Sequence, residues 1–289
     1  MRSSIARVDE RAGVVLAGGR SSRMGRPKSG LEWHGATLLF RTAAVVARAV
    51  TGPVVVVRAP GQELPALPDG VQTVDDPVEG LGPMQGVAAG LGHFRDRAAG
   101  AFVCSTDLPF LHPAYVRGVL RGLDDPAVDL VLPTVRGFRQ PLAAAYRTTL
   151  TTVIEAQIEA GNLRVGSLVE HCTAVQPDDS ALLADPAVAA TDPALDSVRN
   201  VNTPEEYERA RSRPGPDVRV ECVGALARAG RRGPRTVPAA SLGEAASAVD
   251  LTLDRHVLAA VNGDHIVRDP RLPLVAGDTV TFRATAVGD

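Results

Sequence analysis

The sequence is poor in aromatic residues and in cysteine. Only 3% of its 289 residues are aromatic, so a core must be built mainly from the Val, Leu and Ala within an apolar share of 45%. The three cysteines, Cys104, Cys172 and Cys222, lie far apart and form no CxxC pair. An odd number of scattered thiols excludes a disulfide framework and favours a reducing compartment.

Long apolar runs and an excess of charge of either sign are also missing. No stretch reaches the roughly 18 apolar residues that a membrane span needs, and residues 1–12 contain no apolar signal-peptide core. The formal net charge of -2 does not indicate a polyanion-binding surface. We therefore expect a cytoplasmic protein with no membrane and no nucleic acid as partner, long enough for two domains.

Short apolar runs alternate with helical stretches over the first part of the chain. This alternation predicts an α/β fold, a Rossmann-like three-layer domain with a mostly parallel sheet. Ligands of such sheets bind at the carboxyl ends of the strands, where the loops after residues 17 and 104 lie. The expected strands are residues 13–17, 53–57, 71–74, 101–104, 128–132 and 142–146, and the expected helices are residues 37–50, 83–94, 113–123 and 149–160.

The pattern changes near Arg213. Residues 213–217, RPGPD, hold two prolines and a glycine but no apolar residue, which is typical of a linker. Residues 218–289 then alternate short strands with a single helix, SLGEAASAV, an α+β pattern. We expect two domains, 1–212 and 218–289, joined by the linker 213–217.

The most informative segment is the loop after the first strand, LAGGRSSRMGRPK at Leu16–Lys28. Gly18 and Gly19 carry no side chains there, so backbone N–H groups are free to close on an anion. A triphosphate needs a concentration of cationic donors, and a solvated basic turn is the alternative interpretation. The loop has four basic residues within nine positions: Arg20, Arg23, Arg26 and Lys28.

This loop resembles the N-terminal signature of the molybdenum cofactor guanylyltransferases and their wider nucleotidylyltransferase relatives. Four further stretches within residues 13–210 are similar to the family's motifs, in the same order. They are DPVEGLGPMQG at Asp76–Gly86, STDLPF at Ser105–Phe110, QPL at Gln140–Leu142 followed by Tyr146, and NVNTP at Asn200–Pro204. Pro27 stands where the family commonly has Asp, and the segment GRPK is similar to that of the molybdopterin cytidylyltransferases. Both GTP and CTP therefore stay open as the nucleotide substrate.

The resemblance implies Mg²⁺-dependent transfer of GMP from GTP to the phosphate of molybdopterin, with release of pyrophosphate. It assigns backbone contacts with the nucleotide to four residues where the first strand ends and the loop begins. Arg23 and Lys28 would neutralise the triphosphate as pyrophosphate leaves. The four backbone positions are Leu16, Ala17, Gly18 and Gly19.

The resemblance also assigns the metal to Asp107. A carboxylate after a buried strand is costly to desolvate without a cation, and Mg²⁺ is usually held by phosphates plus one or two carboxylates. Capping of the following helix is the alternative role for Asp107. Asp76, or the adjacent Asp75, would select the base or the ribose. The acceptor or metal-side groups would be bound by Asn200 and Asn202.

Two other functions stay open beside this one. The same chemistry could serve another phosphorylated acceptor, such as a sugar phosphate. Alternatively, the chain could be a non-enzymatic nucleotide-binding adaptor that recruits other proteins of molybdenum cofactor synthesis.

The C-terminal stretch resembles the ubiquitin-like sulfur carriers of molybdopterin and thiamin synthesis. The matching residues are VNGDHIV at Val261–Val267 and LVAGDTVTF at Leu274–Phe282. The resemblance implies a β-grasp fold and, in those carriers, a terminal Gly-Gly that becomes a thiocarboxylate. This chain has Val287-Gly288-Asp289 instead, so we expect a docking domain without carrier chemistry.

Overall fold

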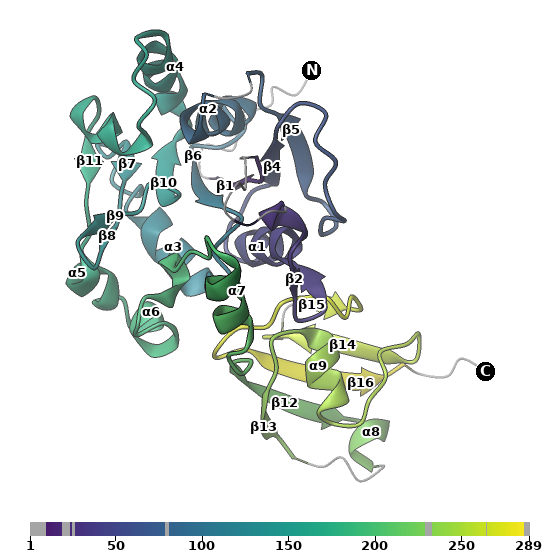
Figure 1. Ribbon diagram of the computed structural model, residues 1–289. Coiled ribbons are helices and arrows are strands. Elements are labelled where there is room, and N and C mark those ends of the chain that lie inside the picture. Colours follow the sequence, from purple (N-terminus) through teal and green to yellow (C-terminus); the bar gives the residue numbers. More distant parts are fainter. Residues whose placement is uncertain are drawn as a thin grey trace, which may run out of the picture. The chain divides into compact units, whose positions relative to one another are not determined.

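The computed structural model describes residues 10–18, 24, 27–78, 81–228, 233–263 and 265–285. The chain divides into two compact units (Figure 1). Unit 1 comprises Met1–Leu31 and Leu38–Pro204, and unit 2 comprises Glu32–Thr37 and Glu205–Asp289.

Unit 1 is built on a seven-stranded sheet with the strand order β11-β7-β10-β6-β1-β4-β5 (Figure 1). Its neighbouring strands are parallel, except that β10 runs antiparallel to both β6 and β7. This confirms the predicted α/β class with a mostly parallel sheet. The strands are β1 (Arg11–Leu16), β4 (Val54–Arg58), β5 (Gln72–Asp75), β6 (Gly100–Ser105), β7 (Leu130–Val131), β10 (Ala143–Arg147) and β11 (Ala174–Val175).

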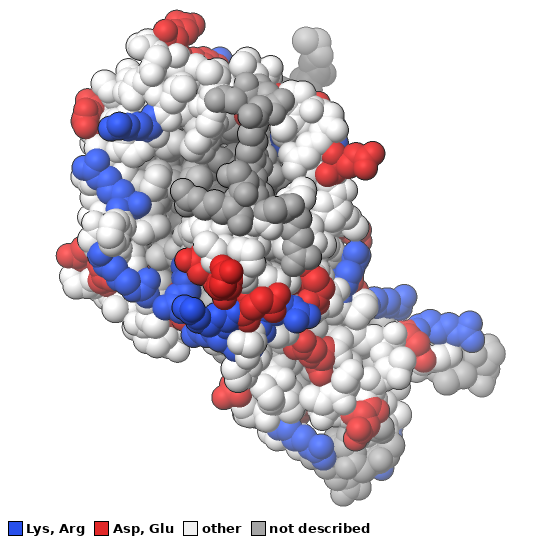
Figure 2. Space-filling model, viewed as in Figure 1, with Lys and Arg blue, Asp and Glu red and all other residues white. Residues whose placement is uncertain are grey.

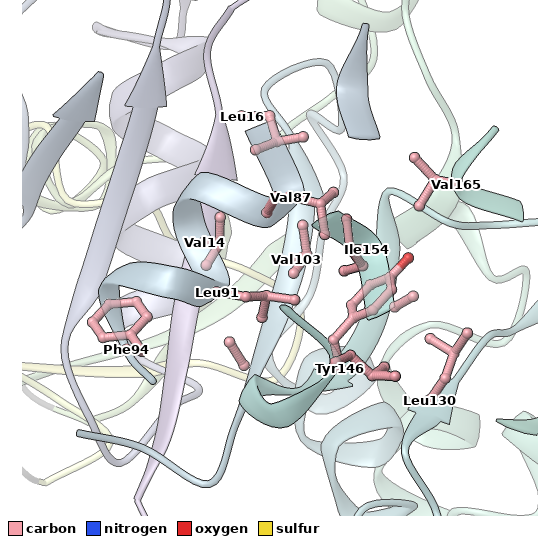
Figure 3. Packing of buried hydrophobic residues seen from close by; sticks show 14 of the residues in the cluster. Val14, Leu16, Val87, Leu91, Phe94, Val103, Leu130, Tyr146, Ile154 and Val165 are labelled. Atoms are coloured by element: carbon pink, nitrogen blue, oxygen red, sulfur yellow. The ribbon is translucent and has the colours of Figure 1, made fainter. Parts of the chain in front are cut away.

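Helices cover both faces of this sheet, which makes three layers. The helices α2 (Pro83–His93) and α4 (Thr151–Glu159) lie on one face, where Val14 of β1 packs in a cluster with Leu91 and Ile154 (Figure 3). The other face carries α1 (Leu38–Ala47) and α3 (Pro113–Arg121). Because side chains alternate along a strand, β1 supplies apolar groups to both layers.

The contact between α2 and β1 is unusually close. A Cβ atom added at Gly90 of α2 would lie 2.4 Å from Cγ1 of Val14, a separation that real Cβ atoms do not show. At Gly92, two residues further along the same helix, the nearest atom would be Cγ2 of Thr151 at an ordinary 3.6 Å. Of these two glycines, Gly90 is therefore the one that the packing of the helix on the sheet requires.

The remaining elements of unit 1 are short, and the sequence did not predict them. The expected strand at residues 128–132 is reduced to the two residues of β7, and the helix expected from residue 149 is preceded by a 3₁₀ turn. The short elements are η1 (Lys28–Gly30), β8 (Thr134–Val135), β9 (Phe138–Arg139), η2 (Thr148–Leu150), η3 (Val165–Glu170), α5 (Asp179–Leu183), α6 (Pro186–Thr191) and η4 (Asp196–Val198).

Unit 2 contains a five-stranded sheet in the order β13-β12-β16-β14-β15. The central pair β12 and β16 is parallel, and the other pairs are antiparallel. Its elements are β2 (Glu32–Trp33), β3 (Ala36–Thr37), α7 (Pro204–Arg211), β12 (Asp217–Val223), α8 (Ala225–Arg228), β13 (Arg235–Pro238), α9 (Leu242–Ser247), β14 (Val257–Val261), β15 (His265–Val267) and β16 (Thr279–Ala284).

A network of side-chain hydrogen bonds lies at one end of this second sheet. Asp278 is buried, and its carboxylate accepts hydrogen bonds from Nδ2 of Asn262 and from the N–H of Val275, each at 2.9 Å. The Oδ1 atom of Asn262 accepts in turn from the N–H of Thr279 at 2.9 Å. This network connects the turn after β14 to the start of β16.

The expected linker packs partly against unit 2. A Cβ atom at Gly215 would lie 2.8 Å from the backbone N of Ala240, and the carbonyl of Pro216 accepts from the N–H of Ala239 at 3.0 Å. These contacts hold the backbone just before β12 against the β13–α9 connection.

Charged side chains of both signs lie side by side on the face of the molecule in Figure 2. Ion pairs among the described residues include Arg95–Glu155 at 3.3 Å and Arg199–Asp196 at 3.4 Å.

In the described part of the chain, no helix is long and apolar enough to cross a bilayer. Cys104, Cys172 and Cys222 are free thiols.

Candidate functional site

Two loops of unit 1 leave the sheet side by side. The strands β1 and β6 are parallel and in register to their last residues, where Leu16 pairs with Ser105. The chain therefore emerges from both strands at the same carboxyl edge. Ala17 and Gly18 follow one strand, and Asp107 follows the other.

Four of the predicted site residues meet at this edge. The Nζ atom of Lys28 donates to Oδ2 of Asp107 at 2.7 Å and to Oδ1 of Asn202 at 2.8 Å. The Nδ2 atom of Asn200 lies 3.5 Å from Oδ1 of Asp107, and the hydroxyl of Ser105 donates to the same oxygen. Asp107 as a residue is only 8% exposed, so its charge is offset by these donors rather than by bulk water.

The alternative role considered for Asp107 is wrong. The N-cap of α3 is His112, whose Nδ1 atom accepts from the N–H of Ala114 at 3.0 Å. The Asp107 carboxylate instead contacts Lys28, Ser105 and Asn200.

The two neighbouring aspartates after β4 and β5 have different surroundings. Asp75 pairs with Arg58, with Oδ1 at 2.7 Å from Nε of the arginine, and more than half of its side chain is exposed. Asp76 lies toward α2 and β1, since its Oδ2 atom is 3.9 Å from the Cβ position of Gly86, where Leu16 also packs. Burial raises the pKa of the Asp76 carboxyl above its ordinary value, and a hydrogen bond from the N–H of Val78 opposes this shift. Of the two, only Asp76 adjoins the end of β1.

The backbone of the first loop is held from β4. The N–H of Ala17 donates to the carbonyl of Val57 at 2.8 Å, and the carbonyl of Ala17 accepts from Nε2 of Gln62 at 3.1 Å. At Gly18 an added Cβ would meet the N atom of Ala59 at an ordinary 3.6 Å. Packing among the described residues therefore does not require glycine at position 18, which favours a ligand as the reason for it.

Other predicted residues cannot be located. Gly19 and Arg23, together with Arg20 and Arg26, lie outside the described residues. The sequence reasoning missed Ser105 and Gln62. Ser105 stood within the quoted STDLPF motif and was detectable as a hydroxyl next to the carboxylate, whereas nothing in the sequence pointed to Gln62.

The donor set limits the kind of metal site. Among the described residues there is no group of three or more His, Cys, Asp or Glu side chains that would hold an ion unaided. One buried carboxylate, with the amide oxygen of Asn202 in the same cluster, fits a hard cation whose other ligands come from phosphate oxygens and water.

The site thus places a basic side chain and a buried carboxylate at the carboxyl edge of a mostly parallel sheet. The chain belongs to the MobA-like NTP transferase domain family, whose model matches residues 13–175, more than half of its length. This confirms the family that was predicted from the sequence.

Named relatives agree with this assignment, and a solved structure shares the fold. The "Probable molybdenum cofactor guanylyltransferase" of Mycobacterium tuberculosis (strain ATCC 25618 / H37Rv) is 37% identical over 173 residues, 57% of this chain and 82% of that protein. The protein of the same name from Mycobacterium marinum is 36% identical over 188 residues, 63% of this chain and 92% of that protein. The molybdopterin-guanine dinucleotide biosynthesis protein A of Archaeoglobus fulgidus has 22% identity and a TM-score of 0.54, over 69% of this chain and 96% of that one.

Proposed function

We propose that this protein transfers GMP from GTP to the terminal phosphate of molybdopterin and forms the guanine dinucleotide cofactor. The single observation that carries the proposal is the cluster of Lys28, Asp107 and Asn202 at the carboxyl edge of the sheet, in a chain related to proteins named molybdenum cofactor guanylyltransferases.

The transfer needs no covalent intermediate on the enzyme. An oxygen of the acceptor phosphate attacks the α-phosphorus of GTP, and the bond from that phosphorus to the bridging oxygen breaks. Pyrophosphate leaves with the electron pair. Catalysis then consists of orienting the two phosphates and neutralising charge on the leaving group.

Each residue of the cluster receives a part in this reaction. Lys28, together with Arg23, neutralises the triphosphate. The backbone of Leu16, Ala17, Gly18 and Gly19 binds the nucleotide, and Asp76 hydrogen-bonds the base or ribose. Mg²⁺, bound by Asp107 and the phosphates, would polarise the α-phosphoryl group. Asn200 and Asn202 bind the acceptor or orient Lys28 and Asp107.

The contact of Lys28 with Asp107 fits an exchange of partners. The two charges neutralise each other at 2.7 Å. In a complex with nucleotide and metal, Lys28 would pair with the phosphates and Asp107 would hold the ion, so neither charge would be left unpaired in a buried site.

Turnover with purified substrates tests the proposal. Incubation of the protein with Mg²⁺, molybdopterin and GTP labelled at the α-phosphate should move the label into a dinucleotide and release pyrophosphate. Parallel reactions contain CTP, or a sugar phosphate in place of molybdopterin. Transfer only from CTP would change the proposed nucleotide from GTP to CTP. Transfer only to the sugar phosphate would change the proposed acceptor. If the protein binds nucleotide but transfers none in any of these reactions, it is a non-enzymatic adaptor.

We further propose that residues 218–289 form a β-grasp domain related to the ubiquitin-like sulfur carriers, with 213–217 as the connection to the transferase domain. Counted along the chain from β12, the sheet order is second, first, fifth, third, fourth, with a parallel central pair and α9 between the second and third strands. The hydrogen bonds of Asn262 with Asp278 and Thr279 join the VNG and GD motifs that carry the resemblance. The domain would serve to dock other proteins of molybdenum cofactor synthesis.

A further inference from the structure

The β-ladder between β1 and β6 ends at Leu16 and Ser105, yet the two loops stay connected one residue further. The hydroxyl of Thr106 donates to the carbonyl of Leu16 at 2.8 Å. The carbonyl of Thr106 accepts from the hydroxyl of Thr42, in α1, at 3.3 Å. Thr106 is 5% exposed and Thr42 is fully buried, so water does not compete for these bonds.

The backbone on the other side of Asp107 is held as well. The Nε atom of Arg41, next to Thr42 in α1, donates to the carbonyl of Pro109 at 2.6 Å. The carbonyl of Asp107 itself accepts from the N–H of Val201 at 3.1 Å. Carbonyls before, at and after the carboxylate-bearing residue are thus each fixed by a donor from outside the loop.

We propose that Thr106 is a positioning residue that fixes the distance between the metal-binding carboxylate of Asp107 and the nucleotide-binding backbone that begins at Leu16. This inference rests on the proposed function. It differs from a purely structural role because Thr106 is adjacent to Asp107 and bonds to the first residue of the nucleotide loop. Loss of its hydroxyl removes this bond between the two loops without removing any group that touches substrate.

The chain offers a matched control. Thr148 is 2% exposed, and its hydroxyl donates to the carbonyl of Ala98 at the same 2.8 Å, with the carbonyl of Ala99 further away at 3.5 Å. It follows β10 (Ala143–Arg147), which is antiparallel to β6, so it lies at the edge of the sheet opposite Asp107. Thr106→Val and Thr148→Val therefore remove the same buried hydroxyl–carbonyl bond, one beside the site and one far from it. Thr106→Ser keeps the hydroxyl.

The test compares these three variants in the full-length protein. We expect kcat/KM for Mg²⁺–GTP to fall by about tenfold to a hundredfold in Thr106→Val, the usual cost of losing a group that orients a metal ligand. Thr106→Ser should restore most of it, and Thr148→Val should keep wild-type activity although both valine variants lose similar thermal stability. Titration calorimetry gives a second readout. The affinity for Mn²⁺–GTP should fall about tenfold in Thr106→Val only, whereas the affinity for GTP in EDTA stays unchanged.

Equal behaviour of Thr106→Val and Thr148→Val would overturn the positioning role, as would failure of Thr106→Ser to recover. A wild-type protein that transfers no nucleotide but binds GTP more tightly with Mn²⁺ would overturn the proposed reaction and leave the calorimetric comparison valid. A wild type whose GTP affinity is indifferent to Mn²⁺ would overturn both.

Discussion

Lys28 and Asp107 are 79 residues apart in the chain, and their charged groups meet at 2.7 Å. A pair of this kind concentrates the chemistry of the site in very few atoms. Asn has nearly the size of Asp but no charge, so a substitution at Asp107 separates the contribution of the charge to activity from its contribution to stability.

Asp107→Asn should lower turnover by about a hundredfold or more, because the amide keeps the shape but loses the charge that binds a cation. Thermal stability should fall far less than turnover, since the amide oxygen still accepts from Lys28 although the charge pair is lost. The melting temperature and steady-state rates check this together. Asp124→Asn is the control: this exposed carboxylate pairs with Arg11 at 3.2 Å and is remote from the site. Near wild-type turnover in Asp107→Asn would remove the residue from the reaction.

Lys28→Ala should reduce kcat by about tenfold to a thousandfold through loss of charge stabilisation in the transition state. A rise in KM for GTP at constant kcat would instead mean that Lys28 binds substrate and transition state equally.

The raised pKa of Asp76 leads to a pH dependence with a defined sign. The role proposed for Asp76 requires its carboxylate form, so affinity for the nucleotide should weaken as the pH falls through a pKa that lies above the usual value of about 4. GTP itself also titrates, and the comparison with Asp76→Asn isolates the side chain: this variant should bind weakly and lack the extra loss of affinity that begins above the usual carboxyl pKa. Asp75→Asn should follow the wild-type curve. The reverse pattern would give the role to Asp75.

The close packing of α2 on β1 makes a prediction for a whole element. Alanine favours a helix over glycine by about 1 kcal/mol, so Gly92→Ala, where a Cβ has room, should leave stability unchanged or raise it. Gly90→Ala forces its Cβ against Val14 at 2.4 Å and should destabilise the protein by about 1–3 kcal/mol despite the better helix propensity. Denaturant unfolding of both variants measures the difference. A stabilised Gly90→Ala variant would mean that the helix shifts freely on the sheet.

Elements with a strong apolar pattern were predictable, and those defined by a partner strand were not. The helix predicted at residues 83–94 is found at Pro83–His93, because periodicity and an N-terminal proline are local signals. The direction of β10 is not encoded in an apolar run, since a buried strand has the same composition in either direction. The two-residue strands β7 and β11 exist only through their ladder.

The same division holds for the site. Motifs identified Lys28, Asp107, Asn200 and Asn202, which the fold brings together. They left Asp75 and Asp76 undecided, because adjacent residues differ only in the side to which they face. Arg58 lies opposite Asp75 in the β4–β5 register and forms an ion pair with it. Asp76 faces Gly86 instead.

At the scale of the whole molecule, every described residue with a proposed part in the reaction lies in unit 1. A chain truncated after Ser212 should therefore remain an active transferase, with kcat/KM for GTP within about threefold of the full chain. Circular dichroism confirms that the shortened protein is folded. Loss of activity from a folded protein would mean that the C-terminal residues help to bind the acceptor.

The bond from Lys28 to Asn202 spans 174 residues of sequence. A ribosome adds about 5–20 residues per second, so Lys28 is made some ten to thirty-five seconds before its amide partner. During synthesis the parallel strands have time to form while the reactive edge of the sheet still lacks one of its sides. The sheet of a nascent chain should thus form well before the site is complete. A chain released before Asn202 is made should be stably folded but should transfer no nucleotide.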